Sequence, residues 1–227
     1  LPLGVLPPWT PMRTSDRTVT MLGKRITFGD NGLPVSIVTA GEELLAAPIR
    51  LPVRRGGKPI VWKAQRCDIV EQAEDHVKVH GLWHGSDMVL DLTCTVEYDG
   101  FCWFEVALSS SREADIDGLA FEIPLRPEAA QYAYRGSVQR GGALSPEGLC
   151  QPISGNLWVG SAERGLAWLT ESQEWVLATD RGRQVEIVPG AGQTLWRSTL
   201  VDTAVALPAP YAARFALHVT PATPVSL

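Results

Sequence analysis

The stretch DMVLDLTCTVEYDGFCWFEVALSS, residues 87–110, decides the fold class. In its first half apolar residues alternate strictly with polar ones: Leu90, Leu92, Cys94, Val96 and Tyr98 against Asp91, Thr93, Thr95 and Glu97. A period of two is typical of a β-strand with one apolar face. The Asp99-Gly100 pair that follows is a turn signal. The stretch therefore predicts two antiparallel strands that continue a meander from residues 67–83.

The rest of the chain has the same texture. Short runs rich in Val, Ile, Thr and aromatic residues are separated by Gly, Pro, Asn and Asp, as in all-β proteins. RTVTMLGKRITF, residues 17–28, predicts two strands about a Gly23-Lys24 turn. Helical signal is limited to one turn in residues 41–49 and a short helix in residues 126–134, both restricted by proline. We predict a large antiparallel β-sandwich with very little helix.

The domain organisation is predicted to be simple. The 227 residues contain 45% hydrophobic and 20% charged residues, enough apolar material for a sizeable core. No repeat or internal linker interrupts the chain. We predict one domain over residues 1–227, with an extended arm at residues 1–15 and a tail at residues 218–227.

Charge and hydropathy exclude two classes of partner. The net charge is −5 and the basic residues are scattered, so a nucleic-acid partner is not expected. No run of about 18 apolar residues predicts a membrane span. The opening LPLGVLPPWTPMR lacks the features of a signal peptide, and a chain that starts this way is expected to be processed or cut from something longer. The compartment and the oligomeric state stay open.

The four cysteines predict no clear disulfide framework. With a two-residue hairpin turn, Cys94 and Cys102 point to opposite sheet faces. With a three-residue loop they share a face but lie too far apart along the strands to pair. Cys67 and Cys150 could pair, and the sequence does not decide it. We predict free, buried thiols.

Metal and cofactor motifs are not recognised in the sequence. His76, His80 and His84 are spaced four apart, but Gly81 and Gly85 are expected to break the strand, and no carboxylate or cysteine motif accompanies the histidines. There is no G-x-S-x-G and no phosphate-binding glycine loop on a strand-to-helix unit. We predict no metal site and no cofactor.

Eight tryptophans are a high count for this length. Flat aromatic rings stack on sugar C–H surfaces, but they also fill sandwich cores. Trp103 and Trp196 lie in mid-strand and are predicted to be core. Trp9, Trp83 and Trp175 adjoin turn signals and are the predicted candidates for exposure, to a ligand or to another domain.

The run VGSAERGLAWLTESQEW, residues 159–175, combines aromatic rings with carboxylates. Alternation places Trp168 on the same face as Leu166, which favours the core. Glu171, Glu174 and Trp175 fall at the end of the predicted strand, where a sugar or a partner domain could reach them. Elsewhere, Glu122 alternates with apolar residues and is expected to face solvent.

Four segments, in this order, resemble a known family. They are PPWTPM (7–12), LPVSIVTAGEELLAAPIRL (33–51), NLWVGSAERGLAWLTESQEW (156–175) and FALHVTPATPV (215–225). The chain resembles the N-terminal β-sandwich of bacterial glycoside hydrolases related to family 123 β-N-acetylgalactosaminidases. The resemblance implies a galactose-mutarotase-like supersandwich followed by a (β/α)8 barrel that carries an adjacent Asp-Glu pair. That pair has no counterpart here, and the ESQEW end departs from the commoner Asp-Arg after Glu-Ser.

The predicted function is therefore a non-catalytic β-sandwich module of a carbohydrate-active enzyme, with no catalytic residue of its own and with a carbohydrate or a catalytic barrel as partner. One alternative is a freestanding carbohydrate-binding module. Another is a mutarotase- or epimerase-like enzyme, which would need a histidine and a carboxylate facing one sugar ring. His218, alone in the terminal strand, is predicted to be structural.

Overall fold

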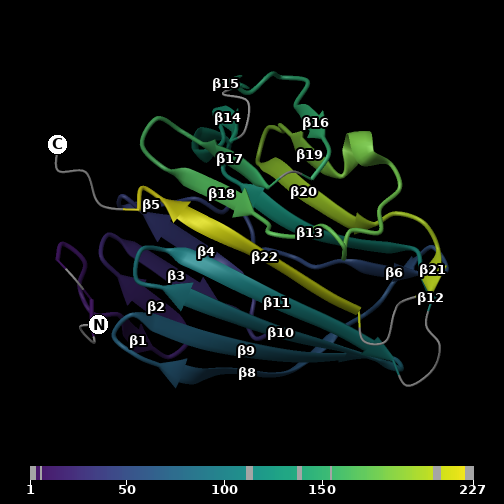
Figure 1. Ribbon diagram of the computed structural model, residues 1–227, viewed down its shortest axis with the longest axis horizontal. Helices are drawn as coiled ribbons and strands as arrows, with labels where there is room; N and C mark the ends of the chain where they lie inside the picture. Colours follow the sequence, from purple (N-terminus) through teal and green to yellow (C-terminus); the bar gives the residue numbers. More distant parts are fainter. Residues whose placement is uncertain are drawn as a thin grey trace.

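The computed structural model describes residues 4–5, 7–110, 115–136, 140–153, 155–206 and 211–222. Antiparallel strands dominate these residues (Figure 1), and their helices are two single 3-10 turns, Pro127–Ala129 and Arg181–Arg183. None of the described helices is long and apolar enough to cross a membrane. The all-β prediction is confirmed.

The largest sheet has nine strands in the order β15-β14-β17-β18-β22-β11-β10-β9-β8. Their bounds are β8 Lys63–Gln72, β9 His76–Gly85, β10 Met88–Glu97, β11 Phe101–Ser110, β14 Tyr132–Arg135, β15 Arg140–Ala143, β17 Asn156–Gly160, β18 Gly165–Leu169 and β22 Tyr211–Thr220. The C-terminal strand β22 therefore lies between the β8–β11 meander and the strands that follow residue 130, and it joins both halves of the sheet (Figure 1).

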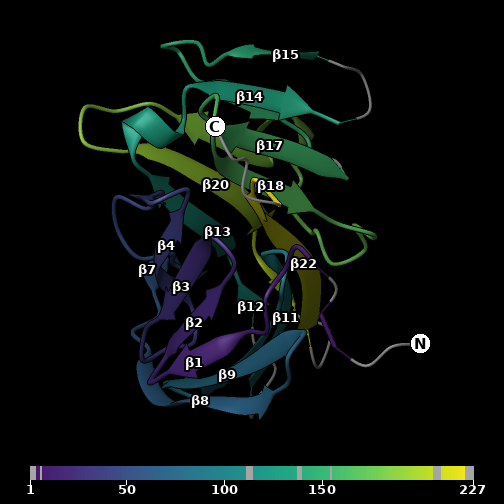
Figure 2. The same cartoon turned by 90° about the vertical axis from the view of Figure 1, so that its left-hand side faces the viewer.

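The described residues also form three smaller sheets. The five-stranded sheet contains β1 Arg13–Ser15, β2 Thr18–Met21, β3 Lys24–Phe28, β4 Pro34–Thr39 and β5 Glu42–Glu43. The six-stranded sheet contains β6 Val53–Arg55, β7 Lys58–Pro59, β13 Gly118–Leu125, β16 Leu149–Gln151, β19 Val185–Val188 and β20 Thr194–Val201. Strands β12 Asp115–Ile116 and β21 Val205–Ala206 form a pair. Figure 2 shows the five- and six-stranded sheets on the same side of the nine-stranded sheet.

The predicted hairpin is present as β10 and β11. Val96 lies opposite Cys102, so the loop is the three-residue alternative, with Gly100 at a φ of 96°. All four cysteines are free, as predicted, but only Cys94 and Cys102 are buried, whereas Cys67 is half-buried and Cys150 is exposed. In the earlier hairpin Met21 lies opposite Lys24, so the turn is one residue earlier than predicted.

An aromatic cluster occupies the space between the nine- and six-stranded sheets. Phe215 stacks on Trp168 at 4.3 Å between ring centroids and meets Phe121 of β13 edge-on at 4.8 Å. Trp168 and Trp196 are 1% and 0% exposed, so both were correctly assigned to the core. The large rings Trp168 and Phe215 occupy core-facing positions of the neighbouring strands β18 and β22.

Trp83 is buried, at 4% exposure, and the prediction that it is exposed was wrong. Strand β9 runs unbroken through Gly81, whose added Cβ would lie 2.4 Å from the carbonyl oxygen of Asn31. The glycine thus allows the Asn31 turn of the five-stranded sheet to touch the nine-stranded sheet. The same carbonyl accepts a hydrogen bond from the Trp83 indole N–H. Gly81 is a packing position rather than a strand break.

Glu122 was predicted to face solvent, yet it is only 7% exposed. Its carboxylate contacts Arg197 of β20 at 2.8 Å and Arg50 at 3.0 Å. The alternation correctly placed Glu122 on the face of β13 opposite Phe121. The two arginines, from distant parts of the chain, then cover it.

The described parts of the predicted arm and tail include strand residues. Strand β1 begins at Arg13 and β22 extends to Thr220. The Nζ of Lys24 donates to the carbonyl oxygen of Ala222 at 2.8 Å, and the Trp9 indole N–H donates to the same oxygen at 3.4 Å. Trp9 and Ala222, from segments near the two ends, therefore lie together beside the start of β3, the central strand of the five-stranded sheet.

Candidate functional site

The outer face of the nine-stranded sheet, opposite the core, carries the candidate site. Along β11 the core positions are Cys102, Phe104, Val106 and Leu108, and the intervening side chains point outward. Trp103 is one of them. It is half-buried and lines a surface pocket, so its assignment to the core was wrong. Its position in mid-strand predicted packing, but the side chain lies on the other face of the sheet.

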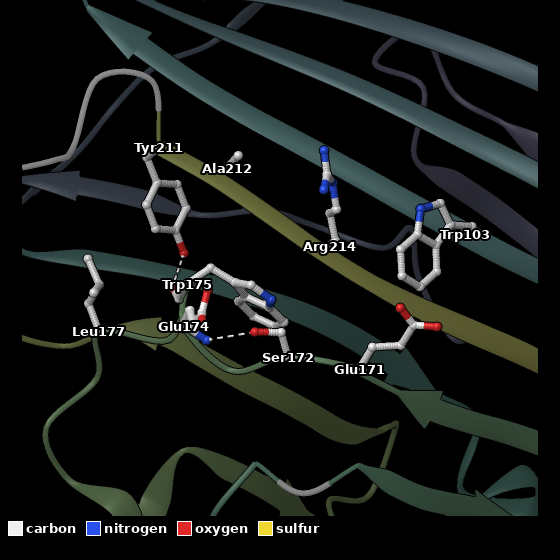
Figure 3. A pocket seen from close by; sticks show the side chains of 9 residues that line it. All are labelled: Trp103, Glu171, Ser172, Glu174, Trp175, Leu177, Tyr211, Ala212 and Arg214. Carbon is white, nitrogen blue, oxygen red and sulfur yellow. Dashed lines mark hydrogen bonds between the residues drawn. The ribbon is translucent and has the colours of Figure 1, made fainter.

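The pocket has a volume of about 490 Å³. It lies between β11, β22 and the loop that follows β18, and Figure 3 shows its lining side chains: Trp103, Glu171, Ser172, Glu174, Trp175, Leu177, Tyr211, Ala212 and Arg214. The three candidate residues of the ESQEW run, Glu171, Glu174 and Trp175, thus line one pocket, and Trp103 and Arg214 come from strands far away in the sequence.

The inner wall of the pocket is apolar and anchored. Trp175 is 8% exposed and packs against Phe215 at 6.0 Å between ring centroids, so the prediction that Trp175 is exposed was wrong. The Tyr211 hydroxyl donates to the Trp175 carbonyl oxygen at 2.6 Å. Burial raises the pKa of Tyr211, so the phenol stays protonated and keeps donating. Among the described residues, the indole N–H of Trp175 has no hydrogen-bond partner.

The outer rim of the pocket is polar. Glu171 and Glu174 are exposed. The backbone N–H of Glu174 is held by the Ser172 hydroxyl at 3.3 Å. Arg214 of β22 pairs across strands with Glu105 of β11 at 3.2 Å. Figure 3 shows the Glu171 carboxylate directed toward the side of the pocket where Trp103 lies.

An aromatic row continues from the pocket across the outer face. Phe101 lies parallel to Trp103 at 6.4 Å and edge-on to His218 at 6.0 Å. Farther along, Trp158 meets Tyr134 edge-on at 6.1 Å. The row spans β11, β22, β17 and β14, with Ala167 of β18 between His218 and Trp158. We call these five side chains, Trp103, Phe101, His218, Trp158 and Tyr134, the aromatic row.

The other two candidate residues lie outside the pocket. Trp83 is buried beneath the Asn31 turn. Trp9 is half-buried and meets Tyr98 edge-on at 5.3 Å. The structure therefore brings together three of the five predicted positions and separates Trp9 and Trp83 from them.

The histidines do not gather. His76, His80 and His84 share the outward face of β9, which is continuous through Gly81. Hydrogen bonds that the His76 ring donates to the Asp75 and Glu71 carboxylates raise the pKa of His76. His80 lies 3.0 Å from Asp91. Within the described residues, no group of three His, Cys, Asp or Glu side chains has the geometry of a metal site.

His218 is partly buried beside Asp99, with 3.6 Å between its Nε2 and the carboxylate. Burial lowers its pKa, while Asp99 opposes that shift. Its Nε2 makes no hydrogen bond to the described residues. The predicted structural histidine is therefore packed against Phe101 rather than hydrogen-bonded at this atom.

A family model described as glycoside hydrolase 123, third domain, matches residues 12–179. The chain belongs to this glycoside hydrolase 123 third-domain family. The resemblance to family 123 hydrolases is thereby confirmed. The family description calls this domain the third, whereas the resemblance implied an N-terminal sandwich. The position of the domain within a longer protein stays a prediction. No curated protein matches the sequence.

Solved structures confirm the fold of this glycoside hydrolase 123 domain. The α-N-acetylgalactosaminidase NagBb from Bifidobacterium bifidum matches with a TM-score of 0.60 and 13% identity. The match covers 91% of this chain but only 36% of NagBb, so the chain spans about a third of that enzyme.

Two smaller proteins match over nearly their whole length. A candidate aldose 1-epimerase from Escherichia coli K12 has a TM-score of 0.52 and 7% identity, over 92% of this chain and 97% of the other. The Slr1438 protein from Synechocystis sp. PCC 6803 has a TM-score of 0.51 and 10% identity, over 92% and 95%. At these identities the likeness shows a mutarotase-like supersandwich fold and nothing about activity.

Proposed function

We propose that this glycoside hydrolase 123 domain is a non-catalytic module that packs against a catalytic barrel and acts within an enzyme on N-acetylgalactosamine-containing glycans. The family membership and the partial match to NagBb support the placement in a larger glycosidase. A module of this kind stabilises and orients its catalytic neighbour, and the barrel supplies the carboxylates that cleave the glycosidic bond.

The aromatic row is the observation that carries the packing proposal. Phe101, Trp103 and Trp158 lie on a sheet face that the other three sheets leave uncovered. Antiparallel sheets that face water normally present polar side chains there. Adjacent large rings on such a face are typical of an interface, because aromatic residues are enriched where domains and proteins meet. We therefore place the barrel against the end of the aromatic row that lies away from the pocket, at Trp158 and Tyr134, where it leaves Trp103 open.

Activity of the isolated chain tests the first part of the proposal. Incubated with an aryl N-acetylgalactosaminide, residues 1–227 are expected to release no more aryl alcohol than buffer does. Turnover that disappears in Glu171→Gln would refute a non-catalytic role.

Assembly in trans tests the second part. Mixed with a separately expressed family 123 catalytic barrel, the chain is expected to form a 1:1 complex in sedimentation velocity. Trp158→Ser should weaken this complex at least tenfold. Val61→Ser is the matched control, since Val61 is an apolar side chain 80% exposed outside the aromatic row. Equal loss in both variants, or in neither, would contradict docking through the aromatic row.

A further inference from the structure

We propose that the pocket beside the ESQEW loop is a binding subsite for an uncharged pyranose, with Trp103 as the stacking surface and Glu171 as the hydrogen-bonding partner of the sugar hydroxyls. The choice of a sugar rests in part on the proposed function, whereas the location and charge preference of the subsite rest on the side chains of the pocket.

Trp103 is placed to present a ring face to a ligand. Its cross-strand neighbours on the outer face are Thr95 of β10 and Ala216 of β22, both small. Because these neighbours are small, they leave part of the Trp103 indole uncovered, and the side chain is half-buried. Phe101 lies beside it with nearly parallel planes, 12° apart, which favours one ring orientation. A flat, held indole is a surface on which the C–H face of a pyranose can pack.

The polar groups of the pocket suit hydroxyls better than anions. Glu171 and Glu174 bring two exposed carboxylates to the rim. Carboxylates accept hydrogen bonds from several donors at once. The one arginine among the lining residues, Arg214, is already paired with Glu105, so its charge is largely balanced. The pocket therefore has an excess of negative charge, which disfavours uronic and sialic acids and admits neutral sugars.

The size and support of the pocket fit a small ligand. A volume of about 490 Å³ lies within the range of small-molecule sites. The inner wall is fixed by the Tyr211 hydrogen bond and by the contact of Trp175 with Phe215. A preformed wall lowers the ordering cost of binding, so even a weak, few-contact ligand can be held at millimolar concentration.

The test is titration of the whole chain with N-acetylgalactosamine, galactose and glucuronate, followed by isothermal calorimetry and by the indole N–H signals in two-dimensional NMR. We expect the neutral sugars to bind with a Kd in the millimolar range and to shift the Trp103 signal. Glucuronate is expected to bind at least tenfold more weakly. Sugar binding is measured without any barrel. Absence of sugar binding would therefore contradict the subsite and not the docking of the barrel, and absence of docking would contradict the docking and not the subsite.

Variants locate the subsite. Trp103→Leu is expected to weaken neutral-sugar binding at least tenfold, and Glu171→Gln about threefold to tenfold. Glu163→Gln, an exposed carboxylate in the loop after β17, is the matched control and should bind as the parent does. A melting temperature within a few degrees of that of the parent establishes that a variant is folded. If Trp103→Leu does not fold, the surface variant Glu171→Gln alone tests the location of the subsite. No binding of either neutral sugar at 100 mM, unchanged affinity in both variants, or glucuronate binding as tight as that of galactose would each overturn the proposal.

Discussion

Replacing Tyr211 with phenylalanine tests whether the inner wall of the pocket depends on one buried hydrogen bond. Tyr211 is 1% exposed, and its hydroxyl donates to the Trp175 carbonyl at 2.6 Å. The substitution keeps the ring and removes the donor. It leaves a buried acceptor unsatisfied, which costs about 1–3 kcal/mol of folding free energy. For a domain of this size each kcal/mol lowers Tm by about 2–4 °C.

We therefore expect Tyr211→Phe to melt about 2–12 °C below the parent in calorimetry or circular dichroism at neutral pH. The matched control is Tyr134→Phe, which removes the same atom from a side chain that is 50% exposed and should shift Tm by less than about 1 °C. If the proposed sugar subsite is correct, Tyr211→Phe should also weaken sugar binding, since Trp175 forms part of the wall. A melting temperature equal to that of the parent would show that the loop does not depend on this bond, and the reasoning about the wall would be refuted.

Three further predictions concern the framework around the site. Gly81→Ala places a Cβ 2.4 Å from a backbone oxygen and should cost about 1–3 kcal/mol in urea unfolding, whereas Gly192→Ala, which meets no atom within 4 Å, should change stability by less than about 1 kcal/mol. Glu122→Ala removes the buried partner of two arginines, and because both arginines are about half exposed the expected loss is about 1–3 kcal/mol; a melt unchanged from the parent would contradict this. Burial lowers the pKa of His218 despite the nearby Asp99 carboxylate. As pH drops below about 6.5, this histidine is therefore protonated more readily in the unfolded chain than in the folded one, and the free energy of unfolding should fall. His218→Gln should flatten that fall between pH 5 and 7.5, and an identical pH profile in parent and variant would contradict it.

Local periodicity predicted the longest strands, but β14, Tyr132–Arg135, largely overlaps residues 126–134, where a short helix was wrongly predicted. The alternation in residues 90–98 predicted which side chains of β10 enter the core, and the same pattern in residues 166–171 placed Trp168 correctly. Such predictions work because the side chains of a strand point to opposite faces in turn, whatever the strand pairs with. The order of the strands was not accessible in this way, since β22 joins two halves of the sheet that are far apart in sequence.

The degree of burial on each face could not be predicted from periodicity, because it depends on segments that are remote in the chain. Glu122 is on the expected face but is covered by Arg50 and Arg197. Trp83 is buried because the Asn31 turn reaches Gly81. A strand pattern contains no information about either contact.

The candidate site illustrates the same limit. The ESQEW run was recognisable because two carboxylates and a tryptophan follow a strand closely, and a loop end is where polar side chains stay accessible. Trp103 and Arg214 could not be assigned to the same site, since the first lies about 70 residues before the loop and the second about 40 after it. Only the pairing of β11 with β22 brings them to the loop. A mid-strand tryptophan is therefore weak evidence for a core position when the sheet has one uncovered face. The small cross-strand neighbours Thr95 and Ala216 are the feature that distinguishes the half-buried Trp103 ring from a fully packed one.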